Sequence, residues 1–201
     1  MPSGDTDVLC SLFKRFSATD GDSGGLQLTQ VKSSAARAIK AKLCAQYPFL
    51  HECSLIDELM PKKATVAVAK CPNHVQVIVI ESVPRFFSVR DKLFFPTLRT
   101  LHEYPRMMRR LRCDEGAIKF VLKGANVMCG GLTSEGAKAD GDDEEVDADM
   151  PVAIFAEGKE HAIAVGVTRM STEEMRQVNK GIGVENVHQL GDGLWRTTTI
   201  S

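Results

Sequence analysis

The segment from Gly116 to Ala137, GAIKFVLKGANVMCGGLTSEGA, governs how the second half of the chain is interpreted. Within it, Ile118, Phe120 and Leu122 alternate with two lysines and a valine. Apolar residues at every second position are typical of a strand with one buried face. Gly-Ala pairs mark the two ends and the middle of the segment, as turns do. The segment therefore predicts a strand between glycine turns.

These glycines do not fit a loop for nucleoside triphosphates. Such a loop needs Gly-Lys followed by Ser or Thr, because the lysine and the hydroxyl contact the terminal phosphates and magnesium. Here Gly131 is followed by Leu132. A second cluster, Gly181–Asn186, begins like a dinucleotide fingerprint but precedes an expected strand instead of a helix. Both clusters are interpreted as structural turns.

The rest of the second half predicts a barrel-like β domain. Its expected elements are a short helix within 95–105, strands at 151–157 and 161–170, a helix at 171–179, and strands at 186–190 and 194–200. The helix at 171–179 carries a capping box, with Ser171 at its start and Glu174 three residues later. Many short strands with few small helices favour a compact barrel.

The first half predicts a small α+β domain. Helical spacing begins at Val31 and gives one apolar face, and a second short helix over 53–60 ends at Pro61. Period-two segments predict three antiparallel strands at 65–70, 75–80 and 84–90. The expected organisation is a flexible leader (1–25), an N-terminal α+β domain (26–93) and a β domain (94–201) with an acidic loop at 139–149.

Composition and cysteine spacing exclude several classes of protein. The chain has 201 residues, of which 43% are hydrophobic and 25% charged, as in an ordinary globular protein. No apolar run reaches the roughly 20 residues that span a bilayer, so we expect a cytoplasmic protein without a membrane partner. The six cysteines are scattered without a CxxC pair, so neither a metal nor any other cofactor is expected.

Catalytic residues are also not expected. The five histidines lie in dissimilar contexts, and none belongs to a nucleophile or zinc motif. The acids of 139–149 form a charge run, whose usual meaning is a solvated loop. We therefore predict that the protein is not an enzyme.

The basic segment 94–138 is the strongest indication of a binding surface. It carries eight basic and four acidic side chains, whereas 139–149 holds seven acids and no base. The candidate RNA-binding cations are Arg99, Arg106, Arg109, Arg110, Arg112, Lys119, Lys123 and Lys138. Glycines beside them would let a nucleic-acid backbone approach main-chain amides, and arginines suit phosphates. A solvated charged face is the alternative, and the charge pattern alone does not decide between the two.

Aromatic residues are few in this segment. Tyr104 and Phe120 are the candidates for base stacking, and Phe120 is expected in the core. The composition therefore favours recognition of structured RNA through shape and phosphates over a stacking platform.

Long blocks of the chain resemble one known family. FPTLRTLHEYP, GAIKFVLKGANVMCGGLTSEGAK, VAIFAEGKEHAIAVGVTRMS, VNKGIGVENVHQLGDGLW and MPKK are similar to the malignant T-cell amplified sequence family of translation-machinery-associated proteins. The resemblance implies that the second half is a PUA domain, an RNA-binding pseudo-barrel, and that the first half is the small α+β domain that precedes it. The glycine loop near bound RNA would be Gly124, Ala125 and Asn126.

The same resemblance implies a function. It would be a non-catalytic translation factor that binds the small ribosomal subunit as a heterodimer with a density-regulated protein homologue. Its tasks would be the removal of deacylated tRNA from post-termination subunits, re-initiation and non-standard initiation. The first domain would dock the partner, and the PUA domain would face tRNA or ribosomal RNA. The alternative is an accessory or adaptor protein in RNA modification that binds structured RNA off the ribosome.

The acidic loop and the leader are both longer than the family pattern implies. Seven negative charges close to the basic segment lead to the hypothesis that the loop competes with RNA for it.

Overall fold

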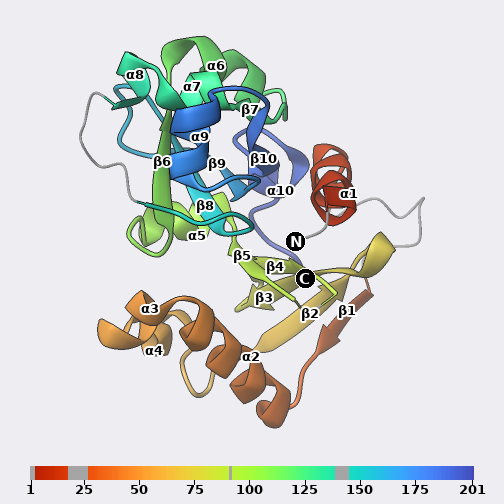
Figure 1. Cartoon of the computed structure of the whole chain (residues 1–201). Coiled ribbons are helices and arrows are strands. Elements are labelled where there is room, and N and C mark those ends of the chain that lie inside the picture. Colours follow the sequence, from red (N-terminus) through yellow and green to blue (C-terminus); the bar gives the residue numbers. More distant parts are fainter. Residues whose placement is uncertain (1–2, 18–26, 91, 139–144) are drawn as a thin grey trace.

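The structure of the chain is a computed structural model that describes residues 3–17, 27–90, 92–138 and 145–201. Figure 1 shows two sheets, each with its own helices, that meet near the centre of the molecule. The expected α+β class is confirmed.

Five antiparallel strands form the first sheet, in the order β1-β2-β3-β4-β5. Their bounds are Gln27–Gln30 (β1), Val66–Lys70 (β2), Val75–Ile80 (β3), Val83–Val89 (β4) and Phe94–Pro96 (β5). The three predicted strands are confirmed as β2, β3 and β4. The edge strands β1 and β5 were not predicted, and β5 continues this sheet past the boundary expected between residues 93 and 94.

Helices α2 (Ser33–Gln46), α3 (Pro48–Glu52) and α4 (Leu55–Leu59) follow β1, and a 3-10 turn over Pro72–His74 joins β2 to β3. Both predicted helices of this domain are present, as α2 and α4. In α2 the buried residue is Leu43. Most of this helix therefore stays accessible along the lower side of the molecule (Figure 1).

The second sheet has the order β6-β8-β9-β10-β7. Its strands are Arg109–Cys113 (β6), Val127–Met128 (β7), Pro151–Ala156 (β8), Ala162–Thr168 (β9) and Ile182–Gln189 (β10). Its helices are Leu98–Glu103 (α5), Glu115–Val121 (α6), Cys129–Thr133 (α7), Glu135–Lys138 (α8), Thr172–Val178 (α9) and Gly193–Arg196 (α10). β6 pairs with β8 in parallel, and the other pairs are antiparallel. The predicted β8 and β9, the helix within 95–105 and the capping box of α9 are confirmed.

The strand predicted within 116–123 is wrong, because this segment is the helix α6. The side chain of Asp114 caps its start by accepting a hydrogen bond from the amide of Ala117 at 2.9 Å. Val121 is buried and Ala117 and Ile118 are half-buried, which is the spacing of one helix face. The alternation of apolar residues that suggested a strand therefore does not correspond to burial.

The last predicted strand, 194–200, is also wrong. The side chain of Asp192 accepts a hydrogen bond from the amide of Trp195 at 2.8 Å and starts the short helix α10 instead. An aspartate at this position satisfies one of the amides that the first turn leaves free. The glycine turn before it thus leads into a helix.

The expected flexible leader contains a helix, α1 (Ser3–Lys14), that belongs to the core. Leu9 and Phe13 are completely buried. The Phe13 ring lies 4.7 Å from that of Phe87 in the first sheet and 5.9 Å from that of His188 in the second (centroid distances). α1 therefore joins the two sheets, and Figure 1 shows it between β10 and the first sheet. The Asp20–Gly25 part of the leader lies outside the described residues.

Candidate nucleic-acid interface

The loop 124–126 closes the C-terminal end of α6. The amide of Gly124 donates to the carbonyl of Val121 at 2.8 Å, and the amide of Ala125 donates to the carbonyl of Phe120 at 3.0 Å. These two bonds form the Schellman pattern of helix ends. Gly124 has a φ of +81°, which glycine adopts without strain. The loop is thus a turn, as expected, but it ends a helix and not a strand.

The amides of Gly124 and Ala125 are already engaged. The amide of Lys123, just before them, also donates to the carbonyl of Phe120, at 3.1 Å, so three consecutive amides bind α6 carbonyls. Capping the helix therefore uses these amides, and they are not free to bind a nucleic-acid backbone. At Gly124 and Ala125, side chains are the groups that could contact an anion.

Asn126 holds the loop against β10. Its Oδ1 accepts a hydrogen bond from the amide of Asn186 at 3.0 Å. In return, Nδ2 of Asn186 donates to the carbonyls of Val121 at 3.0 Å and Ala125 at 3.2 Å. Asn126 therefore positions the loop, and its side-chain oxygen is not free to read a base.

Lys119, Phe120 and Lys123 form an exposed face on α6, which we call the α6 face. Phe120 was expected in the core, but 53% of its surface is exposed. Nζ of Lys119 lies 5.0 Å from the centroid of the Phe120 ring. An exposed aromatic ring beside a lysine suits a nucleotide, since the ring can stack on a base while an ammonium group approaches a phosphate.

Helix α1 supplies a further cation that the sequence analysis missed. A Cβ built at Gly124 would lie 3.2 Å from Nζ of Lys14, so this exposed lysine lies directly beside the loop. The thiol of Cys10 also donates to the carbonyl of Gly124, at 3.5 Å. The contact between α1 and the loop is tertiary, and no local signal in the sequence indicates it.

Two of the predicted arginines make contacts within the protein. The guanidinium of Arg99 lies 4.4 Å from the centroid of the Trp195 ring, and its Nε donates to the Trp195 carbonyl at 3.0 Å. Arg112 donates to the carbonyls of Ala156 at 2.9 Å and Lys159 at 3.4 Å. Both side chains are half-buried, so neither is well placed to bind a phosphate.

The other arginines lie away from α6. Arg106 and Arg109 are exposed, and the guanidinium of Arg106 lies 5.7 Å from the ring of Phe49 in the first domain. Arg110 lies 5.3 Å from the ring of Phe155. They belong to the start of β6 and the turn before it, at the opposite end of this strand from α6 (Figure 1). The side chain of Lys138 lies outside the described residues.

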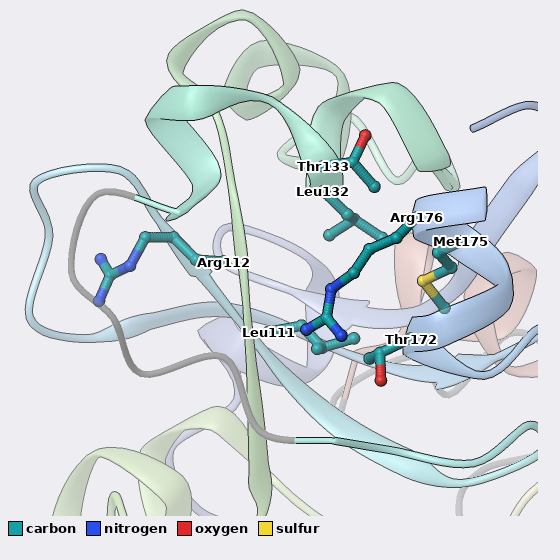
Figure 2. A pocket seen from close by; sticks show the side chains of 7 residues that line it. All are labelled: Leu111, Arg112, Leu132, Thr133, Thr172, Met175 and Arg176. Atoms are coloured by element: carbon teal, nitrogen blue, oxygen red, sulfur yellow. The ribbon is translucent and has the colours of Figure 1, made fainter. Parts of the chain in front are cut away.

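A small cavity between β6, α7 and α9 does not offer a ligand site. Its lining residues are Leu111, Arg112, Leu132, Thr133, Thr172, Met175 and Arg176. Its volume is about 10 Å³, close to the minimum for one water molecule. Figure 2 shows the side chain of Arg112 turned away from the other lining residues, so the two arginines do not converge on a common point.

His188 is engaged in hydrogen bonds, and two cysteine thiols, Cys71 and Cys113, are unreactive. Nδ1 of His188 binds the carboxylate of Asp192 at 2.7 Å, and its Nε2 accepts from the amide of Leu98 at 3.1 Å. Burial raises the pKa of the Cys71 thiol to about 12 and that of Cys113 to about 11, which disfavours the reactive thiolate. Over the described ranges, no three His, Cys, Asp or Glu residues are grouped to hold a metal ion.

Comparison with known proteins assigns each half of the chain to a known type of domain. A Pre-PUA-like domain model matches residues 27–105, and a PUA domain model matches residues 109–190. "Malignant T-cell-amplified sequence 1-A" of Xenopus laevis is 44% identical over 188 residues, which cover 94% of this chain and 99% of that protein. "Malignant T-cell-amplified sequence 2" of Homo sapiens is also 44% identical, over 94% of this chain and 99% of that protein.

The chain belongs to the malignant T-cell-amplified sequence family. The fold agrees with that membership. A hypothetical protein of the archaeon Pyrococcus horikoshii matches 85% of this chain and 99% of its own, with a TM-score of 0.67 and 25% identity. A conserved PUA domain protein of Thermoplasma acidophilum matches 86% of this chain and 99% of its own, with a TM-score of 0.60 and 19% identity. The resemblance noted in the sequence and the expected PUA pseudo-barrel are thereby confirmed.

In this family member, the PUA domain consists of the second sheet with α6 and the loop 124–126 at its upper end (Figure 1). The candidate interface of the PUA domain is the α6 face together with Lys14 of α1. Of the residues predicted from the sequence, Lys119 and Lys123 belong to it, and Gly124, Ala125 and Asn126 shape it. The arginines at the start of β6 form a separate basic group.

Proposed function

We propose that this protein is a non-catalytic translation factor that binds RNA through its PUA domain. Its family membership and the PUA match support an RNA-binding, translation-related protein. Over the part of the chain that is described, no helix is long and apolar enough to cross a membrane. We propose a cytoplasmic site of action, on the small ribosomal subunit.

The α6 face carries this proposal. Lys119 and Lys123 are exposed, Lys119 lies beside the ring of the exposed Phe120, and Lys14 adds a third ammonium group beside the loop. Cations bind nucleic acid by displacing the counterions of phosphates, and an aromatic ring adds stacking on an unpaired base. This combination favours a single-stranded end or a loop of tRNA or ribosomal RNA over a regular duplex.

The finer function follows the family resemblance. We propose that the protein works as a heterodimer with a density-regulated protein homologue that docks on the first domain. The pair would remove deacylated tRNA from post-termination small subunits and support re-initiation and non-standard initiation. An adaptor that binds structured RNA off the ribosome is the second candidate, since the α6 face would serve it equally well.

Sedimentation with purified small ribosomal subunits separates the two candidates. The proposed factor co-migrates with subunits, and Lys119→Glu with Lys123→Glu weakens both this co-migration and the binding of labelled tRNA. The matched control is Lys159→Glu with Lys180→Glu, two exposed lysines of the PUA domain outside the α6 face. Binding to free RNA without co-migration would support the adaptor, and equal binding by both double variants would exclude the α6 face.

A further inference from the structure

The first domain contains an open groove of about 590 Å³ between α2 and the segment before β2. Its lining comes from the end of β1 and the residue after it, from α2 between Ser33 and Lys40, and from residues 60–66. The volume lies within the range of about 300–1,000 Å³ that is usual for ligand sites. The groove is separate from the PUA domain and from the α6 face.

The charge of the groove has one sign. Its lining includes four cations and no carboxylate. Lys40 forms an ion pair with Asp57 at 2.5 Å, and this lysine holds the pKa of the Asp57 carboxyl below its usual value. Arg37, Lys62 and Lys63 are exposed, and within the described ranges they form no ion pair. Nε of Arg37 donates to the carbonyl of Ser33 at 3.4 Å, and Lys62 contributes to the lowered pKa of the Asp57 carboxyl. The two lysines and the terminal nitrogens of Arg37 are therefore available to a ligand.

The remaining lining is mainly apolar. Val31, Ala36, Met60, Ala64 and Val66 contribute aliphatic surface, and the amide of Val31 donates to the carbonyl of Val66 at 2.9 Å, which fixes the two segments together. An apolar floor with a basic rim complements a chain that carries both aliphatic side chains and carboxylates.

We propose that this groove binds a short acidic segment of a partner protein, in which carboxylates alternate with aliphatic residues. The aliphatic residues occupy the floor, and the carboxylates pair with Arg37, Lys62 and Lys63. A nucleic acid fits less well, because the lining has no aromatic side chain on which a base could stack. The proposal deepens the proposed function in one respect, since it says where on the first domain a partner docks.

Fluorescence anisotropy of the full chain with short labelled peptides tests the proposal. The probe is a peptide in which Glu alternates with Leu, and the comparison peptides carry Lys for every Glu or Ser for every Leu. We expect the Glu-Leu peptide to bind about ten-fold more tightly than either comparison peptide, because only it matches both rim and floor. Amide chemical-shift changes at Ala36 and Ala64 would locate it.

Two variants separate the roles of rim and floor. Lys62→Glu with Lys63→Glu reverses the charge of two lysines at the rim of the groove. Ala36→Trp fills the apolar floor without changing the charge. Each should weaken peptide binding about ten-fold, whereas Lys70→Glu, an exposed lysine of β2 outside the groove, should leave it within about two-fold. Melting temperatures confirm that the variants fold.

Equal binding of the three peptides, or binding insensitive to both groove variants, would overturn the proposal. A labelled RNA oligonucleotide that binds the wild-type groove in place of the peptide, and no longer binds the Lys62→Glu with Lys63→Glu variant, would do the same. These measurements use no ribosome and do not involve the α6 face, so a negative result leaves the proposed RNA binding unaffected.

Discussion

Lys14 of α1 packs directly against Gly124 at the end of α6. A Cβ added at Gly124 would lie 2.6 Å from Cε of Lys14, well inside the roughly 3.5–4.0 Å at which carbon atoms pack favourably. The end of α6 is therefore built to fit a side chain from a distant part of the sequence. Helix α1 and the loop 124–126 form one continuous surface.

Replacing Gly124 with alanine should lower the free energy of unfolding by about 1 kcal/mol or more, because alanine is strained at positive φ. Urea denaturation measures this change. The matched control is Gly158→Ala, since Gly158 has a φ of +67° but no atom within 4 Å of an added Cβ. Gly124→Ala should cost more than the control, because the added Cβ would also lie 3.0 Å from Nε2 of the buried Gln189. An equal cost would show that this close packing contributes nothing.

Lys14→Glu should weaken the binding of labelled tRNA and make it less dependent on salt. Removing one ammonium–phosphate interaction reduces the slope of log affinity against log salt by about 0.7–0.9. A salt titration of the wild type and the variant measures this difference. Lys159→Glu serves as the control, and an unchanged slope in Lys14→Glu would exclude α1 from the interface.

Phe120→Ala should weaken RNA binding by about 1 kcal/mol or more while leaving the salt slope unchanged, because stacking involves no counterion release. Stability should hardly change, since 53% of the side chain is exposed. Val178→Ala, at a residue that is 58% exposed on α9, is the control. Restoration of binding by Phe120→Trp would distinguish stacking from a general loss of apolar surface.

Phe13→Ala should lower the free energy of unfolding by about 3–5 kcal/mol, as removal of a buried phenylalanine does. Phe13 contacts both sheets, so unfolding of the wild type should be one transition. Fluorescence of Trp195, the one tryptophan of the chain, reports the second domain, and circular dichroism reports the whole chain. Separate midpoints for the two signals in the wild type would contradict this role of α1.

Replacing the acids of 139–149 that lie outside the described residues with their amides should raise RNA affinity at low salt and have little effect at high salt, because salt screens interactions between charges. Anisotropy at two salt concentrations measures this. The self-competition hypothesis fails if the variant and the wild type bind equally at both. Asp149 is not a suitable position for this test, since it pairs with Arg169 at 3.1 Å.

Elements with a long, regular apolar period were predictable from the sequence. The strands β2, β3, β8 and β9 have several consecutive β-branched or aliphatic residues, and the capping box of α9 is a local signal that needs no tertiary contact. In both cases one pattern agrees with only one kind of element. Tertiary packing and the local signal therefore favour the same structure.

Helix α6 shows why the sequence pattern of a short segment predicted the wrong kind of element. Its alternating apolar residues predict a strand, but the segment also has Asp114 as N-cap and Gly124 as a C-terminal stop, and these are helix signals. Because α6 has only about two turns, the strand period of 2 residues and the helix period of 3.6 residues fit its apolar residues equally well. Which residues are buried depends on β10, where Asn186 donates to the carbonyl of Val121 across 65 residues of sequence. The exposure of Phe120 could not be predicted for the same reason.

The site was predictable in part. Lys119 and Lys123, which belong to the candidate interface, were predicted because charge and glycine turns are visible in the sequence. Lys14 was missed because its place beside Gly124 arises only when α1 packs on the second sheet. Arg99 and Arg112 were included because the sequence cannot show that a guanidinium is occupied by Trp195 or by backbone carbonyls.

The bridging position of α1 has a consequence for how the chain folds as it is made. Thr6 of α1 donates to Glu185 of β10, and 179 residues separate the two. At about 5–20 residues per second, Thr6 is synthesised roughly ten to forty seconds before Glu185. During that interval the ring of Phe13 lacks its contact with His188 of β10. Helix α1 can therefore complete its contacts with both sheets only after β10 has been synthesised.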